Sequence, residues 1–367
     1  MNWQWFVPTK VFYGDDVIKN NASTLKGLGE KAMIVTGQGG SAKRNGSLGD
    51  MTEALESMNI KWELFNAIEA NPSIDTIHKG AEFAKKHGVD FVIGIGGGSP
   101  LDAAKAIAVL AVNDISDEDL FALKFDDVLP IVAVPTTAGT GSEVTPYSII
   151  TYPAIRSKKS IFGDKLFPQV SFLDPKYTLD LPLHITIDTA VDAYAHVLEG
   201  YLSPRHTLLS DLLAKEALGI LGAELRHLAA DKPLAYENRN NLLYGSMLAG
   251  MVISHTATSI PHALSYSLTY FKDIPHGRAN GMVIPEYIKF NLKNSDDPRI
   301  MEVIKYSGFE DVDSFIATMR KLSGTVPKLE DSEIEDYINL AYGTKNIRNN
   351  VIIPELDDLR TILKMSM

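Results

Sequence analysis

Two hydrophobic patterns alternate before Pro182 and only one continues after it, and this arrangement constrains the fold of the 367-residue chain. Runs typical of β-strands at 32–36, 61–65, 91–95 and 131–134 alternate with helical stretches at 49–58, 73–87 and 101–112. Beyond Pro182 the helical patterns follow one another at 185–202, 207–227, 236–266 and 281–292. The sequence therefore predicts an α/β fold with a parallel sheet at 1–181 and an all-helical domain at 182–367.

Composition favours a soluble protein that does not bind nucleic acid. With 35 Lys and Arg against 46 Asp and Glu, the formal charge of -11 disfavours a polyanionic partner. No apolar stretch reaches the roughly 18 residues that span a bilayer, and the N-terminus lacks the basic and apolar regions of a signal peptide. The absence of cysteine excludes disulfides and thiolate metal ligands. We therefore expect a cytoplasmic protein with no membrane partner.

Consecutive glycines at 96–98 join the predicted strand at 91–95 to a predicted helix. Glycine lets the backbone approach a ligand closely, and Ser99 and Pro100 suit the N-cap and first positions of the helix. The helix N–H groups would then point at an anion, so the segment predicts a pyrophosphate site. Its spacing lacks the last glycine of the dinucleotide fingerprint, and a turn that only reverses the chain is the alternative.

A second loop, at 136–143, follows the predicted strand at 131–134 and holds three threonines, one serine and two glycines. Such a segment can surround a nucleotide with hydroxyl and backbone N–H groups, although its composition is also that of an ordinary turn. The two loops together favour nucleotide binding.

Asp192 and His196 are spaced i, i+4 and share one face of a predicted helix, close enough to hold one divalent cation. His262 and His276 follow an apolar helical stretch and would complete a shell of four ligands. One carboxylate with three neutral imidazoles suits Fe(II), Zn(II) or a similar ion. The chain has nine histidines, so an Asp/His pair at this spacing can also arise by chance, and a buried histidine can simply be hydrogen-bonded.

These segments together resemble the iron-containing (group III) alcohol dehydrogenase family. The resemblance is carried by the loops at 96–102 and 135–143, by Leu173-Asp-Pro175, by the Asp192/His196 pair, and by Pro275-His-Gly-Arg-Ala-Asn280. It implies an N-terminal dinucleotide-binding domain and an all-helical C-terminal domain, the architecture shared with dehydroquinate synthases. It also implies a metal held between the domains and a homodimer.

The resemblance assigns the family's site residues one by one. Its metal ligands fall on Asp192, His196, His262 and His276, with Fe(II) as the expected metal and Zn(II) as the alternative. Its contacts with the nicotinamide cofactor fall on Gly96, Gly97, Gly98, Ser99, Asp102, Thr136, Thr137, Thr140, Ser142 and, at the ribose, Lys158.

Two departures from the family bear on the chemistry. Many relatives carry a histidine four residues after the third ligand, where this chain has Tyr266. Tyr266 can still face the metal as a catalytic residue, but with an ordinary pKa of about 10 it needs a lowered pKa or a water chain to transfer a proton. Relatives that prefer NAD often carry an aspartate where this chain has Gly37, and Ser41, Lys43 and Arg44 lie nearby to receive a 2′-phosphate. We therefore predict that NADP(H) is preferred over NAD(H).

The predicted activity is metal-dependent hydride transfer between NADP(H), or NAD(H), and a small primary alcohol or aldehyde, with Fe(II) as the Lewis acid. Metal affinity and activity should fall together as the pH drops below the histidine range, because bound imidazoles must be neutral. Three alternatives stay open: a metal-dependent lyase or cyclase of the dehydroquinate synthase type, a glycerol-type polyol dehydrogenase, and a non-catalytic binding protein.

Overall fold

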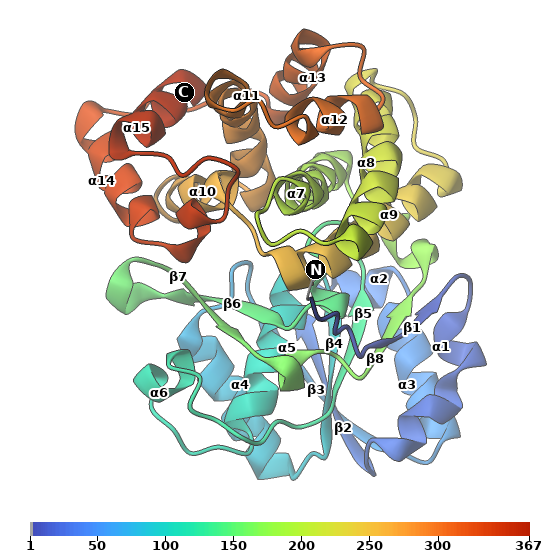
Figure 1. Cartoon of the computed structure of the whole chain (residues 1–367). Coiled ribbons are helices and arrows are strands. Elements are labelled where there is room, and N and C mark those ends of the chain that lie inside the picture. The colour runs from blue at the N-terminus through green and yellow to red at the C-terminus, as the bar shows by residue number, and fades with distance from the viewer. Residues whose placement is uncertain (1–2) are drawn as a thin grey trace. The chain divides into compact units, whose positions relative to one another are not determined.

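The structure, a computed structural model, describes residues 3–367 as two compact units (Figure 1). One unit comprises residues 7–137 and 142–181, and the other comprises 3–6, 138–141 and 182–367. Within the described part of the chain, no helix combines the length and the apolar character needed to cross a membrane.

A six-stranded sheet forms the centre of the α/β unit. Its strands lie in the order β1-β8-β5-β4-β2-β3, and every neighbouring pair is parallel. Their bounds are β1 Lys10–Tyr13, β2 Lys31–Gly37, β3 Lys61–Ile68, β4 Phe91–Gly96, β5 Ile131–Pro135 and β8 Val170–Leu173. The predicted α/β fold with a parallel sheet is confirmed. Strands β1 and β8, and an antiparallel hairpin of β6 (Tyr147–Tyr152) and β7 (Ser157–Phe162), were not predicted.

Successive residues of each strand face opposite sides of the sheet, so the sheet carries a core on each side. On β4, Val92 packs in one core, with the helices α4 (Ile74–His87) and α5 (Gly98–Leu110). Phe91 and Ile93 pack in the other core, with α3 (Ser47–Ser57). Because both faces are covered, the central strands are continuously apolar, which is why the sequence predicts them well.

The glycine loop shows where the predicted start of α5 was wrong. The helix begins at Gly98 with Gly97 as its N-cap, instead of beginning at Pro100 after Ser99. Gly96 has a φ of 150°, and a Cβ there would lie 2.7 Å from Pro100 Cγ, so glycine is required at the turn between β4 and a helix that begins two residues earlier than expected. Pro100 is tolerated in the first turn because N–H groups there have no partner within the helix.

A buried lysine on α5 donates hydrogen bonds to the segment 142–147, which follows β5. Lys105 is fully buried, and its Nζ donates to the carbonyl oxygens of Ser142, Thr145 and Tyr147 at 2.7, 2.9 and 2.8 Å. Burial lowers the pKa of Lys105 to about 8, although the nearby Asp102 carboxylate opposes the shift. Asp102 in turn accepts from Ser142 Oγ at 2.6 Å. One charged side chain therefore supplies the donors for a turn-rich stretch of buried backbone.

Nine helices make up most of the described part of the helical unit. Their bounds are α7 Leu183–Tyr201, α8 Leu208–Ala229, α9 Tyr236–Thr256, α10 Ile260–Lys272, α11 His276–Asn294, α12 Arg299–Tyr306, α13 Val312–Ser323, α14 Asp331–Tyr342 and α15 Leu356–Ser366. Helix α7 is buried from Ala190 to Tyr201 and packs against α8, α9 and α11 (Figure 1).

The single helix predicted at 236–266 is wrong, because the chain breaks between α9 and α10. Ala257 adopts a φ of 57°, which no helix accommodates, and Pro261 occupies the first turn of α10. Proline there cannot continue a helix from the preceding residues but is well suited to begin one. The apolar period runs through the break, and the prediction followed that period although Pro261 marks the start of a new helix.

Replacing Lys105 by Met should destabilise the α/β unit by about 3 kcal/mol or more, because three buried carbonyl groups lose their donor. The urea concentration at half-unfolding, followed by circular dichroism at pH 7, measures the effect. Lys79→Met, on the exposed face of α4, serves as the control and should leave the midpoint nearly unchanged. Equal midpoints for the two variants would contradict this account of Lys105.

Candidate metal centre

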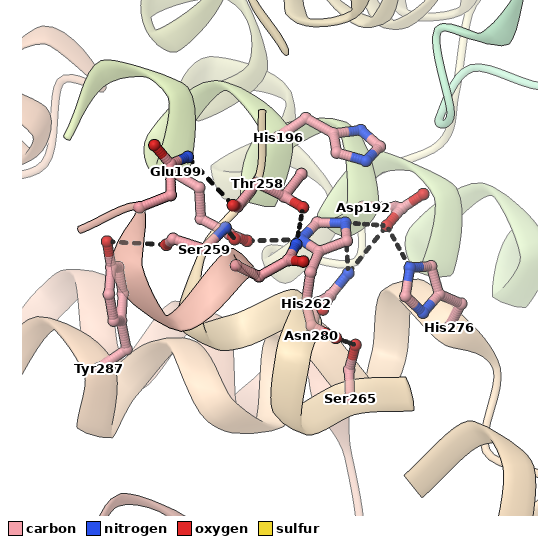
Figure 2. Close-up of polar contacts among 12 residues, drawn as sticks. Asp192, His196, Glu199, Thr258, Ser259, His262, Ser265, His276, Asn280 and Tyr287 are labelled. Atoms are coloured by element: carbon pink, nitrogen blue, oxygen red, sulfur yellow. Dashed lines mark hydrogen bonds and ion pairs between the residues drawn. The ribbon is translucent and has the colours of Figure 1, made fainter. Parts of the chain in front are cut away.

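Helix α7 carries three ionisable side chains on one face. Asp192, His196 and Glu199 are spaced i, i+4 and i+7, so a helix of 3.6 residues per turn aligns them (Figure 2). Their exposed fractions are 4%, 6% and 0%. Buried groups of this kind need hydrogen bonds or a counter-charge, and the neighbouring helices supply the groups that meet them.

His262 on α10 and His276, the first residue of α11, approach this face. One ligand atom each from Asp192, His196 and His262 lies within 4.8 Å of the other two. His276 Nε2 lies 3.7 Å from Asp192 Oδ1, and its ring centroid is 5.1 Å from that of His262. The structure therefore brings the four predicted ligands together, and their binding of a metal remains a prediction.

Hydrogen bonds to the Nδ1 atoms of His196 and His262 determine which nitrogen of each ring carries the proton. His262 Nδ1 lies 2.6 Å from Glu199 Oε1, and His196 Nδ1 lies 3.3 Å from the carbonyl oxygen of Gly139. Because a carboxylate and a carbonyl only accept, both Nδ1 atoms are protonated and both Nε2 atoms keep a lone pair. Burial lowers the pKa of His196, which favours the neutral ring that a metal requires.

The surroundings of Asn280 show that the four side chains fit a cation. Asn280 Nδ2 donates to Asp192 Oδ1 at 2.9 Å and lies 3.3 Å from His262 Nε2. Its Oδ1 is buried without a hydrogen-bond partner among residues 3–367. An oxygen of Asp192 and a nitrogen of His262 thus converge on the same amide group. A carboxylate with neutral imidazoles is a donor set suited to Fe(II) or Zn(II).

A close contact holds the start of α11 against α7. A Cβ on Gly277 would lie 1.8 Å from the carbonyl oxygen of Asp188, so only glycine fits beside His276. Arg278 makes two hydrogen bonds with the Asp188 carboxylate, at 2.9 and 3.1 Å. Asp188 lies one turn before Asp192, and the ion pair therefore sets the position of His276 relative to α7.

Tyr266 lies beside the same cluster, one turn after His262. Its ring stacks on that of His276, with centroids 5.5 Å apart and an interplanar angle of 16°. The Tyr266 ring also meets His262 edge-on at 6.5 Å. The structure thus places the side chain next to the candidate ligands, and its role in proton transfer remains a prediction.

The predicted cofactor residues of the α/β unit gather at the carboxyl ends of strands. Gly96 ends β4, Gly97 and Gly98 begin α5, and a Cβ on Gly97 would lie 3.2 Å from the Thr137 side chain, so the loops after β4 and β5 are adjacent. The chain leaves β2 towards β3 on one side and β4 towards β5 on the other. The end of β2, at Gly37, and the end of β4 therefore flank a point where the strand order reverses, the usual ligand position in open α/β sheets.

The remaining predicted cofactor residues have other surroundings. Ser142 and Asp102 bond each other within the Lys105 network, and Ser99 Oγ accepts from Asn71 N at 3.1 Å. Lys158, on β7, donates to Asn71 Oδ1 at 2.8 Å. Ser41 begins the short helix α2 (Ser41–Arg44), Thr136 follows β5, and Thr140 lies in the segment 138–141 of the helical unit. Their contacts with a cofactor stay predictions.

Sequence reasoning missed Glu199 and Asn280. Glu199 follows Asp192 by seven residues and His196 by three, so the helical spacing that singled out the ligands also places Glu199 on their face. Asn280 follows His276 by four residues and shares its face of α11. The same spacing argument, applied once more on each helix, would have found both residues.

Two family models match consecutive parts of the chain. The model described as iron-containing alcohol dehydrogenase matches residues 8–175, and its C-terminal counterpart, described as Fe-containing alcohol dehydrogenase family, C-terminal, matches residues 186–367. Together these matches cover nearly the whole chain.

Similar proteins carry related names. An NADPH-dependent butanol dehydrogenase of Clostridium saccharobutylicum is 33% identical over 330 residues, which are 86% of this chain and 82% of the relative. A 1,3-propanediol dehydrogenase of Citrobacter freundii is 32% identical over 79% of this chain and 76% of the relative. The crystal structure of an iron-containing alcohol dehydrogenase from Thermotoga maritima superimposes with a TM-score of 0.92, at 38% identity, over 100% of this chain and 99% of that one. The chain belongs to the iron-containing alcohol dehydrogenase family.

Proposed function

We propose that the protein reduces small aldehydes, and oxidises the corresponding primary alcohols, with NADP(H) as the preferred cofactor and Fe(II) as the metal. The observation that carries the proposal is that Asp192, His196 and His262 are buried with one ligand atom each close to the other two. Hydrogen bonds from Nδ1 of both rings leave Nε2 as the nitrogen suited to a metal. Relatives named NADPH-dependent butanol dehydrogenase and NADH-dependent butanol dehydrogenase B support the substrate class, and the cofactor preference rests on Gly37. Cytoplasmic residence and a homodimer remain predictions from the sequence.

In this proposal, Asp192, His196, His262 and His276 hold the metal, which supplies Lewis-acid polarisation of the substrate oxygen. A bound nicotinamide would supply or accept the hydride. In aldehyde reduction the substrate oxygen would then need a proton. Tyr266, whose ring stacks on His276, is the proposed group for this proton.

The α/β unit supplies the groups proposed to bind the cofactor. The N–H groups at the start of α5 are suited to the pyrophosphate, because they carry the positive end of the helix dipole. Gly37 presents no acidic side chain at the end of β2, so a 2′-phosphate meets no repulsion there. Arg44, whose guanidinium donates to the carbonyl oxygen of Gly39 at 2.6 Å, is the proposed phosphate partner.

Charge pairing favours an uncharged substrate over the anionic one of a dehydroquinate synthase-type lyase. Arg278 is paired with Asp188, and Lys272 donates to Glu333 at 2.6 Å. Of the three basic side chains near the candidate ligands in the sequence, Lys272 and Arg278 are therefore neutralised by carboxylates, and Arg205 is exposed. A small diol is the second candidate substrate, since two relatives are named 1,3-propanediol dehydrogenase.

Replacing His262 by Ala should weaken metal binding by more than about 100-fold. Loss of a group that only orients a ligand lowers metal affinity by about 10–100-fold, and loss of the ligand itself should lower the affinity further. Metal content after dialysis, together with oxidation of NADPH by butanal, measures the loss. His206→Ala is the matched control, since His206 is partly exposed and paired with Asp211. Retention of metal and turnover by the His262 variant would exclude this residue as a ligand.

Replacing Gly37 by Asp should weaken the preference for NADPH over NADH. A Cβ at Gly37 would meet Ile68 O at 3.6 Å and Pro100 Cγ at 3.8 Å, which are ordinary contacts, so the side chain fits. We expect kcat/KM for NADPH to fall by about 10-fold, or about 1.4 kcal/mol, while that for NADH changes little. Gly49→Asp, which adds the same charge at an open position on α3, should leave both values unchanged. An unaltered NADPH value in the Gly37 variant would refute the proposed 2′-phosphate site.

A further inference from the structure

Glu199 is the most completely buried ionisable group beside the candidate ligands. Its exposed fraction is 0%, and each of its carboxylate oxygens meets a different donor. Oε1 lies 2.6 Å from His262 Nδ1, and Oε2 accepts from the backbone N–H of Ser259 at 2.5 Å (Figure 2). A buried carboxylate costs several kcal/mol unless such bonds compensate it, so both donors are needed at this position.

We propose that Glu199 is a positioning residue that holds His262 with its proton on Nδ1 and its Nε2 lone pair towards Asp192, so that metal affinity depends on Glu199. This inference rests on the proposed metal centre. The geometry supports it directly, because His262 Nε2 lies 3.7 Å from Asp192 Oδ1 on the opposite edge of the ring from Glu199. A carboxylate behind a metal-binding imidazole fixes the tautomer and raises the basicity of the ring.

The hydrogen bond from the Ser259 N–H to Glu199 also positions His262, because Ser259 is at the start of the helix that carries His262. Ser259 is the N-cap of α10, three residues before His262, and its side chain makes no capping bond to the helix. The N–H of Ser259 is directed to α7 after the chain turns at Ala257, whose φ is 57°. Glu199 therefore ties the start of α10 to α7, the helix that carries Asp192 and His196.

The two donors explain why this position requires a carboxylate. Glutamine has nearly the same shape but only one acceptor oxygen. If that oxygen accepts from Ser259, the amide NH₂ faces His262 Nδ1, which must then lose its proton to Nε2. A ring protonated on Nε2 cannot donate that nitrogen to a metal. If the oxygen accepts from His262 instead, the Ser259 N–H is left unpaired in a buried place.

The test compares binding of Co(II) to the full-length protein and its variants, with affinity from chelator competition and coordination from the visible absorption spectrum. We expect Glu199→Gln to raise the dissociation constant by about 10–100-fold and to change the spectrum. Glu199→Asp keeps two acceptor oxygens and should recover part of the affinity. An unchanged affinity and spectrum in Glu199→Gln would overturn the inference.

Glu224→Gln is the matched control. Glu224 is a buried carboxylate on α8 whose two oxygens accept from Asn238 and Asn241, at 2.8 and 2.9 Å. The substitution removes an acceptor in the same way, and we expect it to leave Co(II) binding unchanged. An equal loss of affinity in both variants would overturn the inference by indicating a general effect on stability. Failure of the unsubstituted protein to bind Co(II) would instead overturn the proposed metal centre, and the inference with it.

A second measurement separates positioning from structure without any metal. In protein labelled with ¹⁵N at histidine, long-range proton–nitrogen spectra report which ring nitrogen of His262 carries the proton. We expect Nδ1–H in the unsubstituted protein and in Glu199→Asp, and a shift towards Nε2–H in Glu199→Gln. The Nε2–H form in the unsubstituted protein would overturn the inference.

Discussion

The burial of charged and polar side chains on α7 is the constraint on which the helical unit depends. Asp192, His196 and Glu199 lie on a face that water does not reach, and each must be matched by a group from another segment. His262 forms a hydrogen bond with Glu199, and Asn280 donates one to Asp192. The carbonyl oxygen of Gly139 accepts a hydrogen bond from His196. The helices α10 and α11 are held in their positions by these polar contacts as well as by apolar packing.

The polar contacts also prepare the site chemically. They engage the Nδ1 atoms of His196 and His262 and leave the Nε2 atoms as lone-pair donors. In the proposed metal complex, Asn280 would give up its bond to Asp192 Oδ1. The α/β unit likewise depends on a buried polar side chain, because Lys105 donates to the carbonyl and hydroxyl oxygens of Ser142.

The parts that could be predicted from the sequence are those whose pattern is local. The strands at 91–95 and 131–134 are continuous apolar runs, and the Asp192/His196 pair is visible as a helical spacing. By contrast, the contact that the Ser259 N–H makes with Glu199 after the break at Ala257 is tertiary and has no local pattern. His262 and His276 were candidates from the sequence, but no local spacing relates them to Asp192, so their assignment as ligands depended on the family resemblance as well. Short strands such as Val170–Leu173 are specified by their pairing with distant strands and lack a local pattern.

X-ray absorption at the iron edge of protein loaded with Fe(II) under anaerobic conditions tests the central claim, because multiple scattering counts imidazole rings around the metal. We predict one iron per chain bound by three imidazoles and a carboxylate oxygen, as Asp192, His196, His262 and His276 require. Iron bound with fewer than two imidazoles, or through carboxylates alone, would contradict the account.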